Sequence, residues 1–103
     1  MGKLRYDGAG EVEFDDRTLS HLQLVIAAKL RRAESFWFTW VKPVSAGSGR
    51  VSIWVHPAIP IEISFAGNRV PAINREWVDL LMRAANSPAG LHLMDEPPAP
   101  SDD

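Results

Sequence analysis

The sequence contains no cysteine and no long hydrophobic run. Without cysteine, the chain has no disulfide, no thiolate zinc site and no cysteine nucleophile. The longest apolar run covers residues 24–28, far short of the roughly 20 residues that a membrane-spanning helix needs. The first residues, MGKLRYDG, lack the apolar stretch of a secretory signal. We therefore expect a cytoplasmic protein with no membrane contact, whose stability comes from its core alone.

Signatures of catalytic and metal sites are also missing. The sequence has no G-x-S-x-G and no G-x-x-x-x-G-K-[ST] motif, and its three histidines show no H-x-x-x-H or H-E-x-x-H spacing. The Gly-rich segment SAGSGR is not followed by a helical pattern, so it has no helix N-terminus to hold a phosphate. These absences predict no catalytic residue, no bound metal and no cofactor.

Charge is nearly balanced but unevenly distributed along the chain. All 11 basic residues precede residue 95, whereas four of the 13 acidic residues lie in the final segment, DEPPAPSDD, with three prolines. Such a composition is typical of disordered chain. We predict a single domain over residues 1–94 and a disordered, acidic, proline-rich tail over residues 95–103. The domain carries a formal charge of only +2, well short of that of a dedicated duplex-DNA-binding protein.

The first third of the chain shows a strand–strand–helix pattern. Alternation over residues 3–6 and 11–15, on either side of an Asp-Gly turn, predicts a β-hairpin. Its expected core side is Leu4, Tyr6, Val12 and Phe14. Apolar residues at helical spacing, after a capping Asp16 or Thr18, predict a helix over residues 18–34. The expected buried stripe of this helix is Leu19, Leu22, Ile26, Leu30 and Ala33. The opposite, exposed side is expected to carry His21, Leu24, Ala28, Arg31 and Arg32.

The rest of the chain predicts four strands and one more helix. The strands cover residues 35–41, 50–56, 61–65 and 91–94. Asn74 is the predicted cap of a helix that runs to about residue 85. The resulting order is ββαβββαβ, in which strands and helices are mixed without regular βαβ units. It predicts an α+β fold with a mainly antiparallel sheet and two helices.

The aromatic segment SFWFTWVKPVSAGSGRVSIWVH, residues 35–56, holds three of the four tryptophans. Its two alternating runs flank a Gly/Ser loop, which predicts a hairpin. The residues expected to face the core are Phe36, Phe38 and Trp40, together with Val51, Ile53 and Val55. The opposite face then carries Trp37 directly across from Trp54, with Arg50 on the same side.

Two interpretations of this aromatic face stay open. A large exposed aromatic surface is usually covered by another part of the chain or by a second subunit. Alternatively, the tryptophans stack on the bases of a single-stranded nucleic acid, worth about 1–3 kcal/mol per base, while Arg31, Arg32 and Arg50 meet phosphates. A further contact surface is the helix face with His21, Leu24 and Arg31.

His56 is the remaining candidate for polar chemistry. It and Glu62 flank the HPAIP turn and are placed to oppose one another. A histidine–carboxylate pair can orient an imidazole for acid–base work, although it is more often a surface hydrogen bond.

Three segments carry a wider resemblance: MGKLRYDG, HLQLVIAAKLRRAESFWFTW and NREWVDLLMRAANSPAGL. Through them the chain resembles a family of short actinobacterial proteins of unknown function, often labelled ATP-dependent DNA ligases. The string Arg5-Tyr6-Asp7-Gly8 is similar to the ligase adenylation motif K-x-D-G, in which the lysine amine accepts AMP. Arg5 stands at the lysine position, and a guanidinium stays protonated and is not a nucleophile. The resemblance thus implies an association with DNA.

Together these patterns predict a non-catalytic interaction module that self-associates or binds a protein partner through the aromatic sheet face. Binding of single-stranded nucleic acid and a ligase-like activity are the alternatives. The candidate binding residues are Trp37, Trp54, Arg50, His56, Arg31, Arg32 and Leu24.

Overall fold

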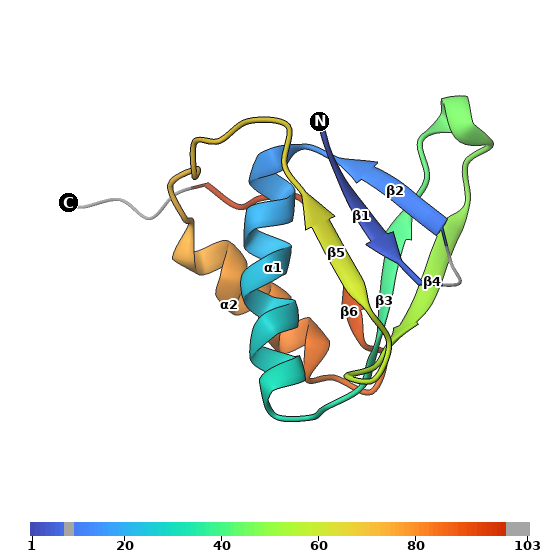
Figure 1. Ribbon diagram of the computed structural model, residues 1–103, viewed down its shortest axis with the longest axis vertical. Helices are drawn as coiled ribbons and strands as arrows, with labels where there is room; N and C mark the ends of the chain where they lie inside the picture. The colour runs from blue at the N-terminus through green and yellow to red at the C-terminus, as the bar shows by residue number, and fades with distance from the viewer. Residues whose placement is uncertain (8–9, 99–103) are drawn as a thin grey trace.

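The computed structural model describes residues 1–7 and 10–98. Within these residues the chain forms six strands and two α-helices in the order ββαβββαβ (Figure 1). The strands are β1 (Gly2–Tyr6), β2 (Gly10–Phe14), β3 (Phe36–Val41), β4 (Arg50–Val55), β5 (Ile61–Ser64) and β6 (Leu91–His92). The helices are α1 (Asp16–Arg31) and α2 (Arg75–Ala85), with a 3-10 turn η1 (Val44–Ala46) in the β3–β4 loop. The predicted α+β class and element order are confirmed.

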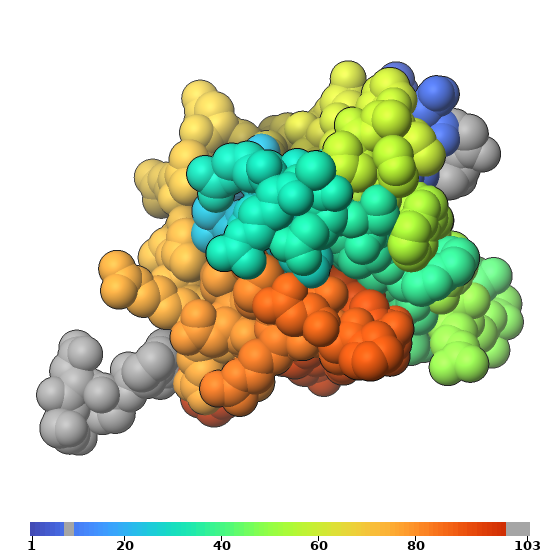
Figure 2. Space-filling view, turned by 90° about the horizontal axis from the view of Figure 1, so that it is seen from below, coloured from blue at the N-terminus to red at the C-terminus, as the bar shows by residue number. Residues whose placement is uncertain are grey.

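The strands form two three-stranded sheets, with orders β2-β1-β5 and β4-β3-β6. The pairing of β3 with β6 is parallel, and the other pairings are antiparallel. The sheets separate because β5, which follows β4 through the HPAIP turn, pairs with β1 and not with β4. Both helices lie on one side of the strands (Figure 1), and they pack side by side (Figure 2). The core therefore lies between the helices and the two sheets.

The predicted inward-facing residues of the aromatic hairpin form a large part of this core. Phe36, Phe38 and Trp40 are all buried, and the Phe38 and Trp40 rings lie 5.1 Å apart. From the first hairpin, Leu4, Tyr6 and Phe14 are buried as well. Val12, which the same alternation placed in the core, is only half-buried.

The ends of the helices follow local hydrogen bonding. The α1 cap is Asp15, whose carboxylate accepts from the Thr18 backbone N–H at 3.2 Å, so the predicted caps Asp16 and Thr18 were one and three residues late. The helix ends at Arg31 because Ala33 takes a left-handed φ of 58°, which leaves Ala33 exposed and outside the buried stripe. The predicted α2 cap, Asn74, is confirmed: its side-chain oxygen accepts from the backbone of Glu76.

The prediction that His21 lies on an exposed helix face is wrong. Its ring is completely buried and stacks on Trp77, with ring centroids 4.6 Å apart. The Asn74 backbone N–H donates to Nε2 at 2.8 Å, and Nδ1 lies 2.7 Å from the Arg17 carbonyl. Since Nε2 is an acceptor, Nδ1 carries the proton and donates to that carbonyl. His21 therefore joins α1 to the start of α2.

The segment after β6 runs back over the start of both helices. The Leu93 backbone N–H donates to Thr39 at 2.9 Å, and the Trp77 indole donates to the Met94 carbonyl at 3.2 Å. Glu96 accepts two hydrogen bonds from the Arg17 guanidinium, at 2.6 and 2.7 Å. Residues 99–103 of the predicted tail lie outside the described residues. Within the described part of the chain, neither helix has the length and hydropathy of a transmembrane span.

Candidate functional site

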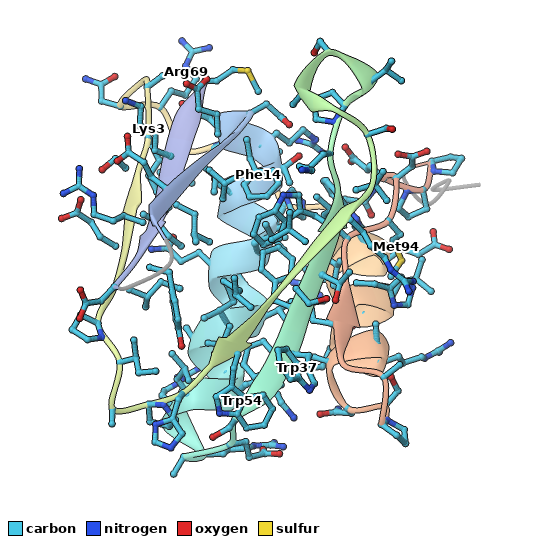
Figure 3. All side chains as sticks on the ribbon, turned by 90° about the vertical axis from the view of Figure 1, so that its right-hand side faces the viewer. Lys3, Phe14, Trp37, Trp54, Arg69 and Met94 are labelled. Carbon is cyan, nitrogen blue, oxygen red and sulfur yellow. The ribbon has the colours of Figure 1, made fainter. Side chains whose placement is uncertain are left out.

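Trp37 and Trp54 lie directly opposite one another on neighbouring strands β3 and β4, as the hairpin pattern predicts. Their ring centroids are 5.3 Å apart with an interplanar angle of 64°, an edge-to-face arrangement. The two side chains lie together at one end of the hairpin (Figure 3). Although they contact each other, Trp37 is 47% exposed and Trp54 is 43% exposed. The pair leaves a large aromatic surface in contact with solvent.

The pair belongs to one face of the β3–β4 hairpin, which we call the tryptophan face. It consists of Trp37, Thr39, Val41, Arg50, Ser52 and Trp54. The Thr39 and Ser52 hydroxyls are hydrogen-bonded at 2.7 Å in its centre. His92 of β6 lies beside Thr39 in parallel register. A shallow hollow of about 350 Å³ is lined by Trp37, Thr39, Arg50, Ser52 and Ala89.

The position of the helices leaves this face open. In antiparallel strands, alternate residues point to opposite sides, so the buried Phe36, Phe38 and Trp40 direct the tryptophan face away from the core. Both helices pack on the core side. Among the described residues no helix or strand packs across the exposed tryptophans.

Gly90 brings the chain close to the back of Trp37. A Cβ atom at Gly90 would lie 2.7 Å from the Trp37 carbonyl oxygen and 2.8 Å from its Cβ, and Gly90 has a φ of +87°. Only glycine combines this backbone conformation with so close an approach. The α2–β6 connection therefore supports the tryptophan face from one side.

The edge of β4 next to the tryptophan face is partly blocked. Strand β4 is the outer strand of its sheet, so the backbone groups along one side of it have no strand partner. The Tyr6 hydroxyl, from β1, donates to the Trp54 carbonyl. Burial raises the pKa of Tyr6, which keeps the hydroxyl protonated as a donor. Another molecule can therefore reach the tryptophan face more easily from above the sheet than along the free edge of β4.

The structure distributes the other predicted binding residues over different surfaces. Arg31 and Arg32 are exposed at the end of α1, and Arg32 lies 3.9 Å from Glu34. Leu24 is 45% exposed and lines a separate hollow of about 340 Å³ with Phe65 and Ile73. Leu24 and Arg31 are exposed as predicted, but His21 is buried and does not belong to this helix face.

His56 does not form the predicted pair with Glu62. Its Nδ1 accepts from the Ala58 backbone N–H at 3.0 Å, which stabilises the turn after β4. Glu62 lies instead on the β1–β5 sheet, 4.0 Å from Arg5. Of the predicted binding residues, Trp37, Trp54 and Arg50 lie on the same face of one hairpin, with the tryptophans and Arg50 toward opposite ends.

Apart from Tyr6, the shifted pKa values belong to carboxylates and arginines in surface contacts away from the tryptophan face. Hydrogen bonds from Arg5 and the charge of Lys3 lower the pKa of Glu11. Hydrogen bonds from the backbone of residues 66 and 67 lower the pKa of Asp16. Each shift follows from a structural contact, and none points to an acid–base site. The described residues also contain no group of three histidine or carboxylate side chains that would hold a metal ion.

Of the residues similar to the adenylation motif, Arg5 and Tyr6 are the last two residues of β1, and their side chains lie on opposite sides of the strand. Arg5 is exposed, and its guanidinium donates twice to Glu11, at 3.0 and 3.2 Å. Tyr6 is buried in the core, on the opposite side of the strand. Asp7 is exposed, and Gly8 lies outside the described residues.

Comparison with models of protein families assigns the chain to a family. A family model described as "Domain of unknown function (DUF7882)" matches residues 1–96. The chain belongs to this family. The DUF7882 match spans both sheets, both helices and the tryptophan face. No curated protein and no solved structure matches the chain.

Sequence reasoning missed one feature, a cleft between the two sheets. Its volume is about 670 Å³, and it is bounded by the β1–β2 and β3–β4 hairpins. Trp40, Val51 and Ile53 line it from one side, and Val12 and Phe14 from the other. Alternation alone assigned all these residues to a closed core. The separation of the sheets, which depends on where β5 pairs, has no local sequence signal.

Proposed function

We propose that this DUF7882 domain is a non-catalytic interaction module that self-associates through the tryptophan face. The observation that carries the proposal is the Trp37–Trp54 pair, nearly half exposed on an open sheet face. Exposed aromatic patches mark interaction sites, and tryptophan is enriched among residues whose truncation costs an interface about 2 kcal/mol or more.

The composition of the face supports a second copy of the chain as the partner. A two-fold interface brings the same patch of both subunits together, so the patch must complement itself. The tryptophan face has aromatic rings at one end, hydroxyls in the centre and Arg50 at the other end. When two such faces pack in opposite directions, each Arg50 meets the partner's aromatic end. A guanidinium over an indole contributes roughly 0.5–2 kcal/mol.

Analytical ultracentrifugation over a range of micromolar concentrations tests self-association. The wild-type chain is expected to sediment as a dimer, and Trp37→Ser and Trp54→Ser are expected to shift it toward monomer. Leu24→Ser is the matched control, because Leu24 is exposed to a similar extent but lies outside the tryptophan face. A monomeric wild-type chain at the highest concentration, or dissociation by Leu24→Ser alone, would contradict the proposal.

The second candidate function is the binding of single-stranded nucleic acid by the same face. The hollow that both Trp37 and Arg50 line favours it, because a base can stack on the aromatic ring while a neighbouring phosphate meets the cation. An oligonucleotide titration at low salt, followed by tryptophan fluorescence, is expected to show quenching that weakens with added salt. Arg50→Gln should reduce the salt dependence. No quenching at low salt would exclude this candidate.

The proposal does not extend to ATP-dependent ligase activity. Arg5 stands where the resemblance would require a lysine nucleophile, and its guanidinium is engaged with Glu11. We expect no covalent AMP adduct after incubation with labelled ATP. Detection of such an adduct on the wild-type chain would overturn the non-catalytic assignment.

A further inference from the structure

We propose that the cleft between the two sheets binds a small, uncharged and mainly apolar molecule that accepts a hydrogen bond from Trp40. The cleft shares Val41 with the tryptophan face but neither of its tryptophans, because Trp40 and Trp37 point to opposite sides of β3. Its volume of about 670 Å³ lies within the range of about 300–1,000 Å³ that is usual for small-molecule sites.

The walls of the cleft are apolar and aromatic. Phe14 and Trp40 meet edge to face, with ring centroids 5.7 Å apart and an interplanar angle of 81°. Figure 3 shows Phe14 between the two hairpins. Val12, Val51 and Ile53 are only half-buried although they face inward, because the diverging sheets leave space in front of them. This space would accept an aromatic or aliphatic body without rearrangement of the core.

The indole of Trp40 supplies a hydrogen-bond donor to this apolar space. Trp40 is only 8% exposed, yet within residues 1–7 and 10–98 its N–H has no acceptor. The other buried indole, that of Trp77, donates to the Met94 carbonyl. Among the described side chains, every fully buried nitrogen has a hydrogen-bond partner. The Trp40 N–H has none, so it must be at least partly accessible to solvent. In the proposed complex this N–H donates to the ligand, because Trp40 lines the cleft.

The charges at the mouth of the cleft favour an uncharged ligand. Glu11 is engaged by Arg5 at 3.0 Å and by Lys3 at 3.6 Å. The remaining charged side chains that line the cleft are those of Glu13 and Lys42, one of each sign. A charged ligand would lose its hydration inside apolar walls without a net opposite charge to compensate. A ketone, ester or ether on an apolar body matches both the walls and the Trp40 donor.

The neutral dye 6-propionyl-2-dimethylaminonaphthalene, which joins a naphthalene ring to a ketone, is a suitable probe of the full chain. Its emission is expected to shift to the blue and to saturate as protein is added. Val12→Phe, which fills the cleft at a half-buried position, should weaken binding at least tenfold. Trp40→Phe keeps the aromatic ring but removes the donor, and should weaken binding about two- to tenfold, as expected for one neutral hydrogen bond.

Trp37→Phe is the matched control, because it makes the same change on the opposite side of the same strand. It should leave the affinity for the dye within twofold of wild type. The absence of saturable binding, or Val12→Phe binding as tightly as wild type, would overturn the proposal. Loss of binding in Trp37→Phe would also overturn it, because the dye would then occupy the tryptophan face.

The experiment also separates the cleft from the self-association proposed above. Dye affinity that falls as the protein concentration rises would place a second copy in the cleft and overturn the small-molecule proposal. If the chain is a dimer but does not bind the dye, only the proposed ligand site in the cleft is contradicted. If the chain is a monomer and binds the dye, only the proposed self-association is contradicted. Thermal unfolding of each variant verifies that it is folded when binding is measured.

Discussion

Glu96 lies against Arg17, and the two oxygens of its carboxylate accept from two nitrogens of the guanidinium at 2.6 and 2.7 Å. The two residues are 79 positions apart in the chain. The same carboxylate accepts from the Asn74 side chain at 3.0 Å. One acidic side chain therefore connects the starts of both helices to the segment that follows β6.

This contact predicts a loss of stability in acid. The hydrogen bonds from Arg17 and then Asn74 lower the pKa of Glu96 from 4.5 to about 2. Because the folded state holds the carboxylate ionised, its contribution is present above the unshifted pKa of 4.5 and is lost as the pH falls toward 2. Chemical denaturation at a series of pH values is expected to show this decline. In Glu96→Gln the decline should be smaller, and parallel curves for the two proteins would contradict the assignment.

Substitution of Trp37 is expected to destabilise the monomer far less than substitution of a buried tryptophan. Trp77 is buried against His21 and in the core, so Trp77→Ala should lower the free energy of unfolding by about 3–5 kcal/mol. Trp37→Ala, measured under monomeric conditions, should cost much less, because nearly half of the side chain is already solvated. Urea denaturation measures the free energy of unfolding of both variants. Equal losses would show that Trp37 is part of the core.

The close approach of Gly90 to Trp37 predicts that Gly90→Ala is destabilising. The new Cβ would collide with the Trp37 backbone, and the positive φ adds strain of about 1–3 kcal/mol. Gly49→Ala is the control, since Gly49 has a similar φ of +101° but no atom within 4 Å of the added Cβ. The free energy of unfolding should therefore fall further for Gly90→Ala than for Gly49→Ala. Equal values would show that the backbone conformation alone matters.

Replacement of His21 is expected to weaken the connection between α1 and α2. His21→Leu keeps an apolar side chain in the core but leaves the Asn74 backbone N–H without its acceptor. A buried donor left unsatisfied costs about 1–3 kcal/mol. The exposed Leu24→Ala, three residues along the same helix, should change stability by only about 0.5 kcal/mol. Differential scanning calorimetry compares the two, and a neutral His21→Leu would contradict the proposed role.

The sequence predicted best those features that depend on neighbours along the chain. The alternation around the Gly/Ser loop predicted that Trp37 pairs with Trp54, and the register confirms it. Asn74 was predicted as a helix cap from its position before an amphipathic run, and its side chain caps α2. These features depend on strand geometry and capping, which act over a few residues.

The errors arose where distant segments meet. His21 was assigned to a solvated face because it lies outside the main apolar stripe of α1. It is buried because α2 and Asn74 pack on that flank of the helix. The half-buried state of Val12 has a similar origin, since the two sheets diverge beside it.

The sequence by itself determined the α+β class, the order of the elements and which residues of each strand share a side. These follow from hydrophobic periodicity, which reflects the geometry of a single strand or helix. Only the tertiary structure decided that β5 pairs with β1, that the sheets open into a cleft and that the described helices leave the tryptophan face uncovered. These depend on pairing between distant segments, whose outcome is set by the packing of the whole chain.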